Sequence, residues 1–185
     1  MDIQQLPLPY ANSLQQRDPA TIELLVIHCT ELPDLSTARE YGQTVHYPAS
    51  GTGNSGHFYI DRDGSCQQWV PVERIAHHVR GMNAQSIGVE LVNLGRWPDW
   101  FHAAHQQPEQ TYPAVQIEAL IELIAYLRQT LPNLGQIAGH ADLDRQQIPS
   151  ADDPEIVIQR KIDPGPLFPW STVLEQSGLK RSIPQ

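Results

Sequence analysis

Apolar positions along the chain fall into short runs and one long periodic stretch, which together predict an α/β fold. Residues 22–30, 86–93 and 136–140 are short runs rich in apolar residues, as expected of buried strands. Residues 57–61 and 66–70 flank an Asp63-Gly64 pair, a pattern typical of a β hairpin. Between residues 113 and 131, apolar side chains recur at helical spacing, which predicts a helix with one core-facing side.

The order of these elements predicts a single α/β domain over residues 1–185, with a central mixed β-sheet flanked by helices. The polar, proline-containing residues 1–20 are expected to form an N-terminal arm that lies on the domain. Residues 141–160 are expected to form a long loop beside a cleft, with residues 144–158 at its rim and supplying no metal ligand.

Composition narrows the possible classes of function. The 185 residues are 40% hydrophobic and 18% charged, which is typical of a globular domain. The net charge of −9 and the scattered basic residues argue against nucleic acid as a partner. No apolar stretch approaches the ~20 residues that a membrane span needs, and we expect a monomer.

The N-terminal residues have neither the basic nor the apolar region of a signal peptide, so the chain as given is expected to be cytoplasmic. A periplasmic or secreted location is the alternative, if the sequence is a mature form or is exported by another route. Cys29 and Cys66 are too few for a disulfide scaffold.

Candidate metal ligands lie at the ends of two predicted strands. His28 closes the first strand and His140 closes a later one, and Asp163 stands in an Asp-Pro-Gly-Pro segment. Two histidines and one carboxylate leave one tetrahedral position open on zinc, which is the catalytic pattern. The carboxylates between residues 141 and 160 are competing candidates for the third ligand: Asp142, Asp144, Asp152 and Asp153.

Glu90 is a carboxylate in an otherwise apolar strand. Such a group is costly to bury unless it is paired or functional, so Glu90 is either a salt-bridge partner or a general base. Lys161 lies two residues before Asp163, where its ammonium group would stabilise an oxyanion near the metal.

Four segments of the chain resemble the zinc-dependent N-acetylmuramoyl-L-alanine amidases of the AmpD/AmiD type. This family shares its fold with peptidoglycan recognition proteins and phage lysozyme-type amidases. The segments occur in the family's order, from about residue 22 to residue 170: Val26-Ile27-His28, Ser55–Ile60, Ser86–Leu91, and Gly139-His140 followed by Lys161–Pro166.

The resemblance implies a bacterial hydrolase of cell-wall degradation or muropeptide recycling. It would cleave the amide between the lactyl group of N-acetylmuramic acid and L-alanine, with peptidoglycan or a muropeptide as its partner. One Zn²⁺ per chain would be bound by His28, His140 and Asp163. Glu90 aligns with the family's catalytic glutamate and Lys161 with its catalytic lysine.

Substrate contacts are expected from the segment before Glu90. His78 and Asn83 match a histidine and an Asn-x-x-Ser-Ile-Gly element of the family, and Arg80 is a candidate for pairing with a peptide carboxylate. The 20 residues between His140 and Lys161 are more than the family usually shows, which leaves the preference for polymeric wall or 1,6-anhydro-muropeptides open. The alternative function is a non-catalytic peptidoglycan-binding module on the same fold.

Overall fold

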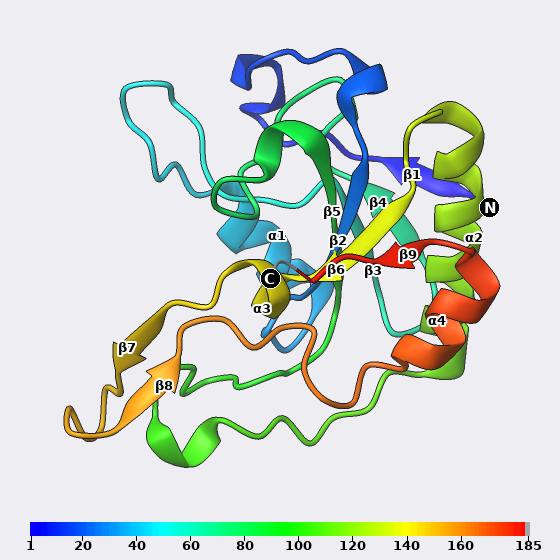
Figure 1. Ribbon diagram of the computed structural model, residues 1–185. Helices are drawn as coiled ribbons and strands as arrows, with labels where there is room; N and C mark the ends of the chain where they lie inside the picture. The colour runs from blue at the N-terminus through cyan, green and yellow to red at the C-terminus, as the bar shows by residue number, and fades with distance from the viewer. Residues whose placement is uncertain (184–185) are drawn as a thin grey trace.

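The computed structural model describes residues 1–183, which form a central sheet with helices on both faces (Figure 1). The α-helices are α1 (Leu35–Gln43), α2 (Ala114–Thr130), α3 (His140–Leu143) and α4 (Trp170–Ser177). Short 3-10 helices cover Ala11–Ser13, Pro19–Thr21, Asn83–Gln85 and Ala103–His105. No helix of the described residues has both the length and the apolar character needed to cross a bilayer.

Seven of the described strands form the main sheet, in the order β1-β4-β3-β5-β2-β6-β9. Their bounds are β1 Ile3–Gln5, β2 Leu24–Cys29, β3 Phe58–Ile60, β4 Cys66–Gln68, β5 Ser86–Leu91, β6 Gln136–Gly139 and β9 Lys180–Arg181. β3 and β4 are antiparallel and the other pairs are parallel. The predicted α/β architecture with a central mixed sheet is confirmed.

The two faces of the sheet differ in what packs against them. Successive residues of the central strands point to opposite faces. Leu25 and Ile27 of β2 belong to the large core cluster with α2 and α4. Leu24 and Val26 belong to a small cluster with Val79. His28 continues this second series, so its side chain is directed away from α2 and towards the face that carries the cleft.

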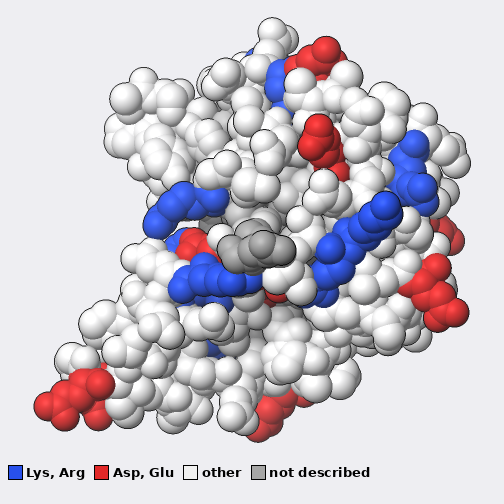
Figure 2. Space-filling model, viewed as in Figure 1, with Lys and Arg blue, Asp and Glu red and all other residues white. Residues whose placement is uncertain are grey.

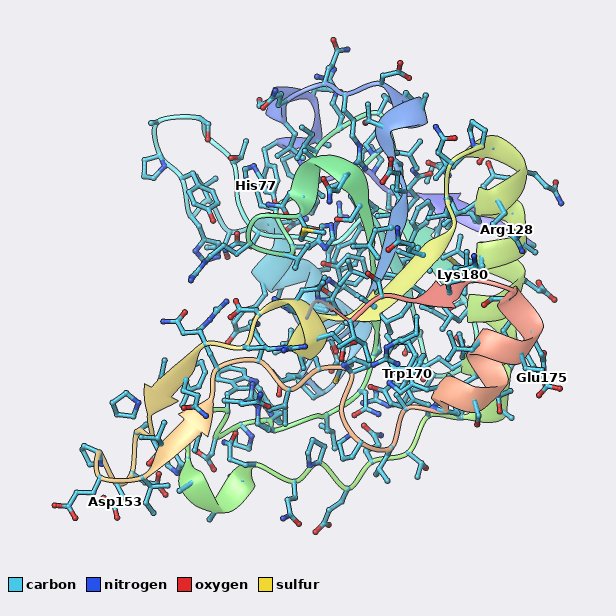
Figure 3. The ribbon with its side chains drawn as sticks, viewed as in Figure 1. His77, Arg128, Asp153, Trp170, Glu175 and Lys180 are labelled. Atoms are coloured by element: carbon cyan, nitrogen blue, oxygen red, sulfur yellow. The ribbon has the colours of Figure 1, made fainter. Side chains whose placement is uncertain are left out.

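Two segments expected to be irregular contain strands. The N-terminal arm supplies β1, which pairs in parallel with β4. Residues 147–159 form a hairpin of β7 (Gln147–Pro149) and β8 (Val157–Gln159), not an irregular loop. Main-chain pairing holds these short segments together, and their side chains show no hydrophobic period that would have revealed them. The hairpin projects from the domain, with Asp153 at its tip (Figure 3).

Candidate metal centre and active-site cleft

One cavity of about 630 Å³ opens at the carboxyl ends of β2, β5 and β6. Ligands of open α/β sheets bind preferentially outside the carboxyl ends of the strands, so this is the favoured place for a site. The cavity walls include all the residues that the sequence favoured for metal binding, catalysis and substrate binding, but none of the competing carboxylates: His28, His78, Arg80, Asn83, Glu90, His140, Lys161 and Asp163.

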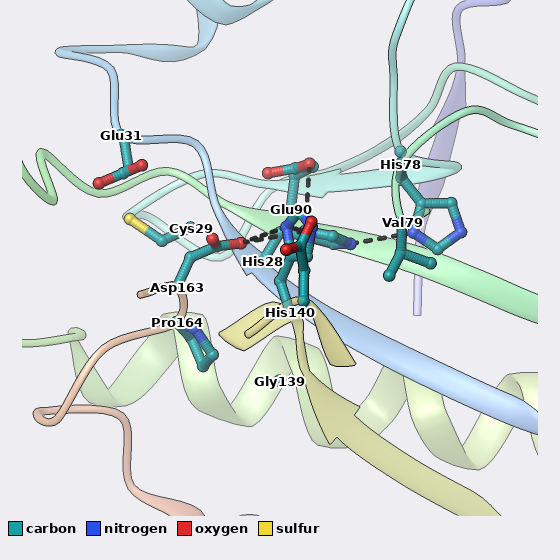
Figure 4. A network of polar contacts seen from close by, with 12 residues as sticks. His28, Cys29, Glu31, His78, Val79, Glu90, Gly139, His140, Asp163 and Pro164 are labelled. Atoms are coloured by element: carbon teal, nitrogen blue, oxygen red, sulfur yellow. Dashed lines mark hydrogen bonds and ion pairs between the residues drawn. The ribbon is translucent and has the colours of Figure 1, made fainter. Parts of the chain in front are cut away.

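Three of these residues bring one ligand atom each to a common point (Figure 4). The Nδ1 atoms of His28 and His140 are 3.0 Å apart, and each lies 3.1 Å from Oδ2 of Asp163. β2 supplies His28, and His140 follows the neighbouring parallel strand β6 directly. The main-chain N–H of Ala141 donates to the carbonyl oxygen of Asp163, which ties the third residue to the second.

The geometry of this triangle fits a metal ion. Zinc–nitrogen and zinc–oxygen bonds near 2.0 Å in a tetrahedral arrangement place ligand atoms about 3.3 Å apart, close to the spacing observed here. All three side chains are buried, and among the described residues Oδ1 of Asp163 has no hydrogen-bond partner. A cation between the three ligand atoms would compensate this buried carboxylate, so the cluster is able to bind a metal.

The protonation states suit metal binding as well. Burial lowers the pKa of His28 to about 4, so its ring is neutral at pH 7 and free to offer a lone pair. Burial alone would raise the pKa of Asp163, but the adjacent His140 and His28 outweigh it and hold this pKa well below its ordinary range. Neutral imidazole and ionised carboxylate are the forms that bind metals.

Glu90 faces this cluster from β5. The register between β2 and β5 places Glu90 directly opposite His28, and Oε1 of Glu90 lies 4.0 Å from Nδ1 of His28. Burial and the nearby carboxylate of Asp163 raise the pKa of Glu90 to about 8, although the ammonium group of Lys161 acts in the opposite direction. A dication at the triangle would act in the same direction as Lys161 and favour the carboxylate form.

Charged side chains of both signs line the cleft: Glu31, Glu90 and Asp163, and three cations. Arg80, Arg160 and Lys161 line the cavity. Figure 2 shows basic and acidic side chains interspersed on the face that carries α3, with further acidic side chains at the hairpin tip. Arg160 pairs with Asp144, whereas Arg80 and Lys161 form no ion pair with another described residue, so these two cations are available to a negatively charged group of a ligand.

The four competing carboxylates of residues 141–160 have other partners. Asp142 accepts from Arg181 and from the main-chain N–H of Gly139, at 2.7 Å in each case. Asp144 pairs with Arg160. Asp152 accepts from the main-chain N–H of Ala103 at 2.7 Å. Asp153 lies at the hairpin tip (Figure 3) and accepts from the N–H of Glu155.

His78 contacts His28, and both nitrogen atoms of its ring have partners within the protein. Its Nδ1 is 2.9 Å from Nε2 of His28, and its Nε2 is 3.2 Å from Oγ of Ser86. In this geometry both ring nitrogens of His78 have a partner within the protein, whereas the sequence favoured a contact with the substrate. A hydrogen bond to the second nitrogen of a metal-binding histidine fixes its tautomer and orientation.

Asn83 and Arg80 lie on the same side of the cleft. Oδ1 of Asn83 accepts from the main-chain N–H groups of His78 and Val79, at 3.0 and 2.8 Å, and thereby shapes this part of the wall. Arg80 is exposed at the mouth of the cleft, where its guanidinium donates to Oε1 of Gln146 at 3.0 Å. Arg80 therefore links the wall to the base of the β7–β8 hairpin.

Sequence reasoning missed a buried ion pair in the cavity wall. The carboxylate of Glu31, three residues after His28, accepts from the guanidinium of Arg96 at 2.7 and 2.9 Å. No local pattern links two residues 65 positions apart, so only their contact in the fold reveals the pair.

Known proteins are similar to this chain in sequence and in fold. Residues 18–166 match the N-acetylmuramoyl-L-alanine amidase family. N-acetylmuramoyl-L-alanine amidase AmiD of Escherichia coli is 32% identical over 172 residues, which cover 84% of this chain and 53% of AmiD. The endolysin of enterobacteria phage K11 is 32% identical over 111 residues, which cover 60% of this chain and 65% of the endolysin. This chain thus spans less than two thirds of either relative.

Solved structures extend the comparison to the whole fold. N-acetylmuramoyl-L-alanine amidase LysC from Clostridium intestinale superposes with a TM-score of 0.68 at 20% identity, over 97% of this chain and 99% of LysC. AmiD from E. coli, in complex with anhydro-N-acetylmuramic acid-L-Ala-D-gamma-Glu-L-Lys, gives a TM-score of 0.62 at 26% identity, over 86% and 58%. Together with the family match, these similarities confirm the resemblance found in the sequence: this chain belongs to the N-acetylmuramoyl-L-alanine amidase family.

Proposed function

We propose that this protein is a zinc-dependent hydrolase of the amide bond between the lactyl group of N-acetylmuramic acid and L-alanine. The substrate would be peptidoglycan or a muropeptide, and one Zn²⁺ per chain would be held by His28, His140 and Asp163. The observation that carries the proposal is the arrangement of Glu90 and Lys161 in the same cavity wall as this triangle. A related protein, AmiD, is named as a complex with such a substrate.

Zinc bound in the triangle would supply a Lewis acid and would lower the pKa of a coordinated water to about 7. Glu90 would take a proton from the attacking water and deliver it to the leaving amine of L-alanine. Burial raises the pKa of Glu90, and the bound zinc would lower it again, which favours the carboxylate that the first of these steps needs. Lys161 would stabilise the negative charge that develops on the amide oxygen.

The other residues of the cavity wall would either position a metal ligand or shape and contact the substrate site. We propose that His78 positions His28 through their 2.9 Å contact and does not touch the substrate. Asn83 would hold the wall that the substrate meets, and the exposed Arg80 would pair with a carboxylate of the peptide stem. The exposure of Arg80, which forms no ion pair with another described residue, supports this role.

Two substitutions test the proposal on the zinc-loaded protein. Glu90→Gln is expected to keep zinc and fold but to lose ~10²–10⁴-fold in kcat, since general acid–base catalysis contributes about that much. Asp163→Ala is expected to lose zinc. Zinc content would be measured by elemental analysis, and products by mass spectrometry on soluble anhydro-muropeptides and on intact peptidoglycan.

The exposed Glu118 of α2 offers a matched control, because Glu118→Gln makes the same chemical change far from the cavity. It should behave as wild type. Turnover in Glu90→Gln within a few-fold of wild type would exclude Glu90 as the general base. A wild-type protein that retains peptidoglycan but releases no product would instead be a binding module.

A further inference from the structure

Glu31 and Arg96 form an ion pair at the edge of the cleft that the proposed chemistry does not use. Arg96 is 2% exposed and Glu31 is 7% exposed, so both charges are almost entirely removed from water. Glu31 is the second residue after β2 and lies in the left-handed backbone region, with φ of 51°. Its carbonyl oxygen accepts from Nε1 of Trp100 at 2.8 Å. Burying two charges is costly unless their hydrogen bonds are complete.

The guanidinium of Arg96 has five acceptor atoms around it, as many as it has N–H groups: three belong to side chains and two to the main chain. Nε donates to Oε1 of Glu31 at 2.7 Å, and Nη2 donates to Oε2 of Glu31 at 2.9 Å and to the carbonyl oxygen of Arg160 at 3.1 Å. Nη1 donates to Oε1 of Gln106 at 3.0 Å and to the carbonyl oxygen of Gln159 at 3.2 Å. A guanidinium has five donors in a rigid fork, and each of them has an acceptor here. The orientation of the Arg96 guanidinium is therefore fixed.

Two of these acceptors belong to the main chain just before Lys161. The carbonyl oxygens of Gln159 and Arg160 therefore have fixed positions relative to Glu31, which is only three residues from His28 along the chain. β8 ends at Gln159, and the segment with Lys161 and Asp163 follows it. The contacts of Arg96 therefore hold the main chain at the junction between the hairpin and this segment. A single buried side chain thus links the strand end at His28 to this segment.

We propose that Arg96, anchored by Glu31, is a positioning residue that sets the place of Lys161 beside the His28–His140–Asp163 triangle. The inference rests on the proposed function, in which Lys161 acts on the amide oxygen. Stabilisation of a developing charge depends steeply on donor position, and a misplacement of about 1 Å can cost ~10²-fold in rate. Asp163 has its own anchor, because its carbonyl oxygen accepts from Ala141. The loss of Arg96 should therefore affect Lys161 more than the metal site.

The experiment compares Arg96→Lys with a matched control in the zinc-loaded full chain. Arg96→Lys keeps the charge but replaces a rigid fork of five donors by three donors on a flexible stem. The control is Arg39→Lys, because Arg39 also donates to two main-chain carbonyl oxygens, those of Leu6 and Pro7, at a place away from the cleft. Glu31→Gln is a second test variant, in case Arg96→Lys does not fold.

Two readouts separate positioning from general destabilisation. Amide hydrogen exchange of residues 159–163, followed by mass spectrometry, reports directly on the segment and needs no activity. The kinetic readout is kcat and KM on a soluble muropeptide, for each variant alone and combined with Lys161→Met. We expect faster exchange at residues 159–163 in Arg96→Lys but not in Arg39→Lys. We also expect a fall in kcat of ~10- to 10²-fold with KM and zinc content nearly unchanged.

In the Lys161→Met background, Arg96→Lys should cause little further loss of kcat, because residues that act through one another are not additive. Unchanged exchange at residues 159–163 would overturn the inference. It would also be overturned if Arg96→Lys lowered kcat by the same factor with and without Lys161. If the wild-type protein released no product, the proposed function would fail, while the exchange data would still decide whether Arg96 holds the segment.

Discussion

The contact between Gly88 and His78 makes a specific prediction about metal affinity. Gly88 lies in the middle of β5, two residues before Glu90, and the ring of His78 packs directly on it. A Cβ atom added at Gly88 would lie 2.6 Å from both Cγ and Nδ1 of His78, and 3.0 Å from its Cδ2. Gly88→Ala should therefore push the ring of His78 away from the sheet.

The size of the effect follows from these distances. Ordinary contacts between carbon atoms are at least about 3.5 Å, so the ring would have to move by about 0.9 Å. The hydrogen bond between His78 and His28 is 2.9 Å long, and a displacement of this size would break it. Loss of such a partner costs ~10- to 100-fold in metal affinity. Overpacking should also lower the free energy of unfolding by ~1–3 kcal/mol.

Competition with a chromophoric chelator would measure the zinc affinity of Gly88→Ala, and urea unfolding of the zinc-free protein would measure its stability. Gly135→Ala is the matched control, because a Cβ there would meet only the carbonyl oxygen of Asn133, at 3.8 Å. Its zinc affinity should equal that of wild type. If Gly88→Ala binds zinc within about 2-fold of wild type, then the contact between His78 and His28 does not support the metal site.

Two other predictions concern the hairpin and the buried histidines. Shortening the β7–β8 hairpin at its tip, residues 151–155, should leave zinc bound and change the ratio of activity on polymeric wall to activity on small muropeptides; a constant ratio would contradict a gating role. Burial holds the pKa values of His57 and His78 well below 6.5, so these rings are neutral in the folded protein. The unfolded chain takes up protons as pH falls through about 6.5, so the stability present above this pH is lost below it, by up to ~1.4 kcal/mol per pH unit and histidine. Glu90, with its pKa raised to about 8, acts in the opposite direction over this range, so the test uses the zinc-free Glu90→Gln variant, which lacks that group. Urea unfolding of this variant at pH 7.5 and 5.5 would measure the loss, and equal unfolding free energies would refute it.

The central strands, α2 and the family resemblance could be predicted from the sequence because each depends on neighbouring residues. β2 and β5 are continuous apolar runs, and the core-facing side of α2 repeats at helical spacing. The position of His28 at the end of one such strand and of Glu90 within another already marked them as candidates. β1, β7, β8 and β9 could not be predicted in this way, since strands of two or three residues are stabilised by pairing with distant main chain.

The contacts within the site depend on the tertiary structure. Four nearby carboxylates competed with Asp163, and the fold distinguishes them by giving Asp142, Asp144 and Asp152 other partners. The contact of His78 with His28 joins residues 50 positions apart, and that of Arg96 with Glu31 joins residues 65 positions apart. Residue types and local order determined which groups were available for chemistry. Only the packing of the strands and loops decided which of them meet, because each hydrogen bond depends on ångström-scale distances between segments remote in the sequence.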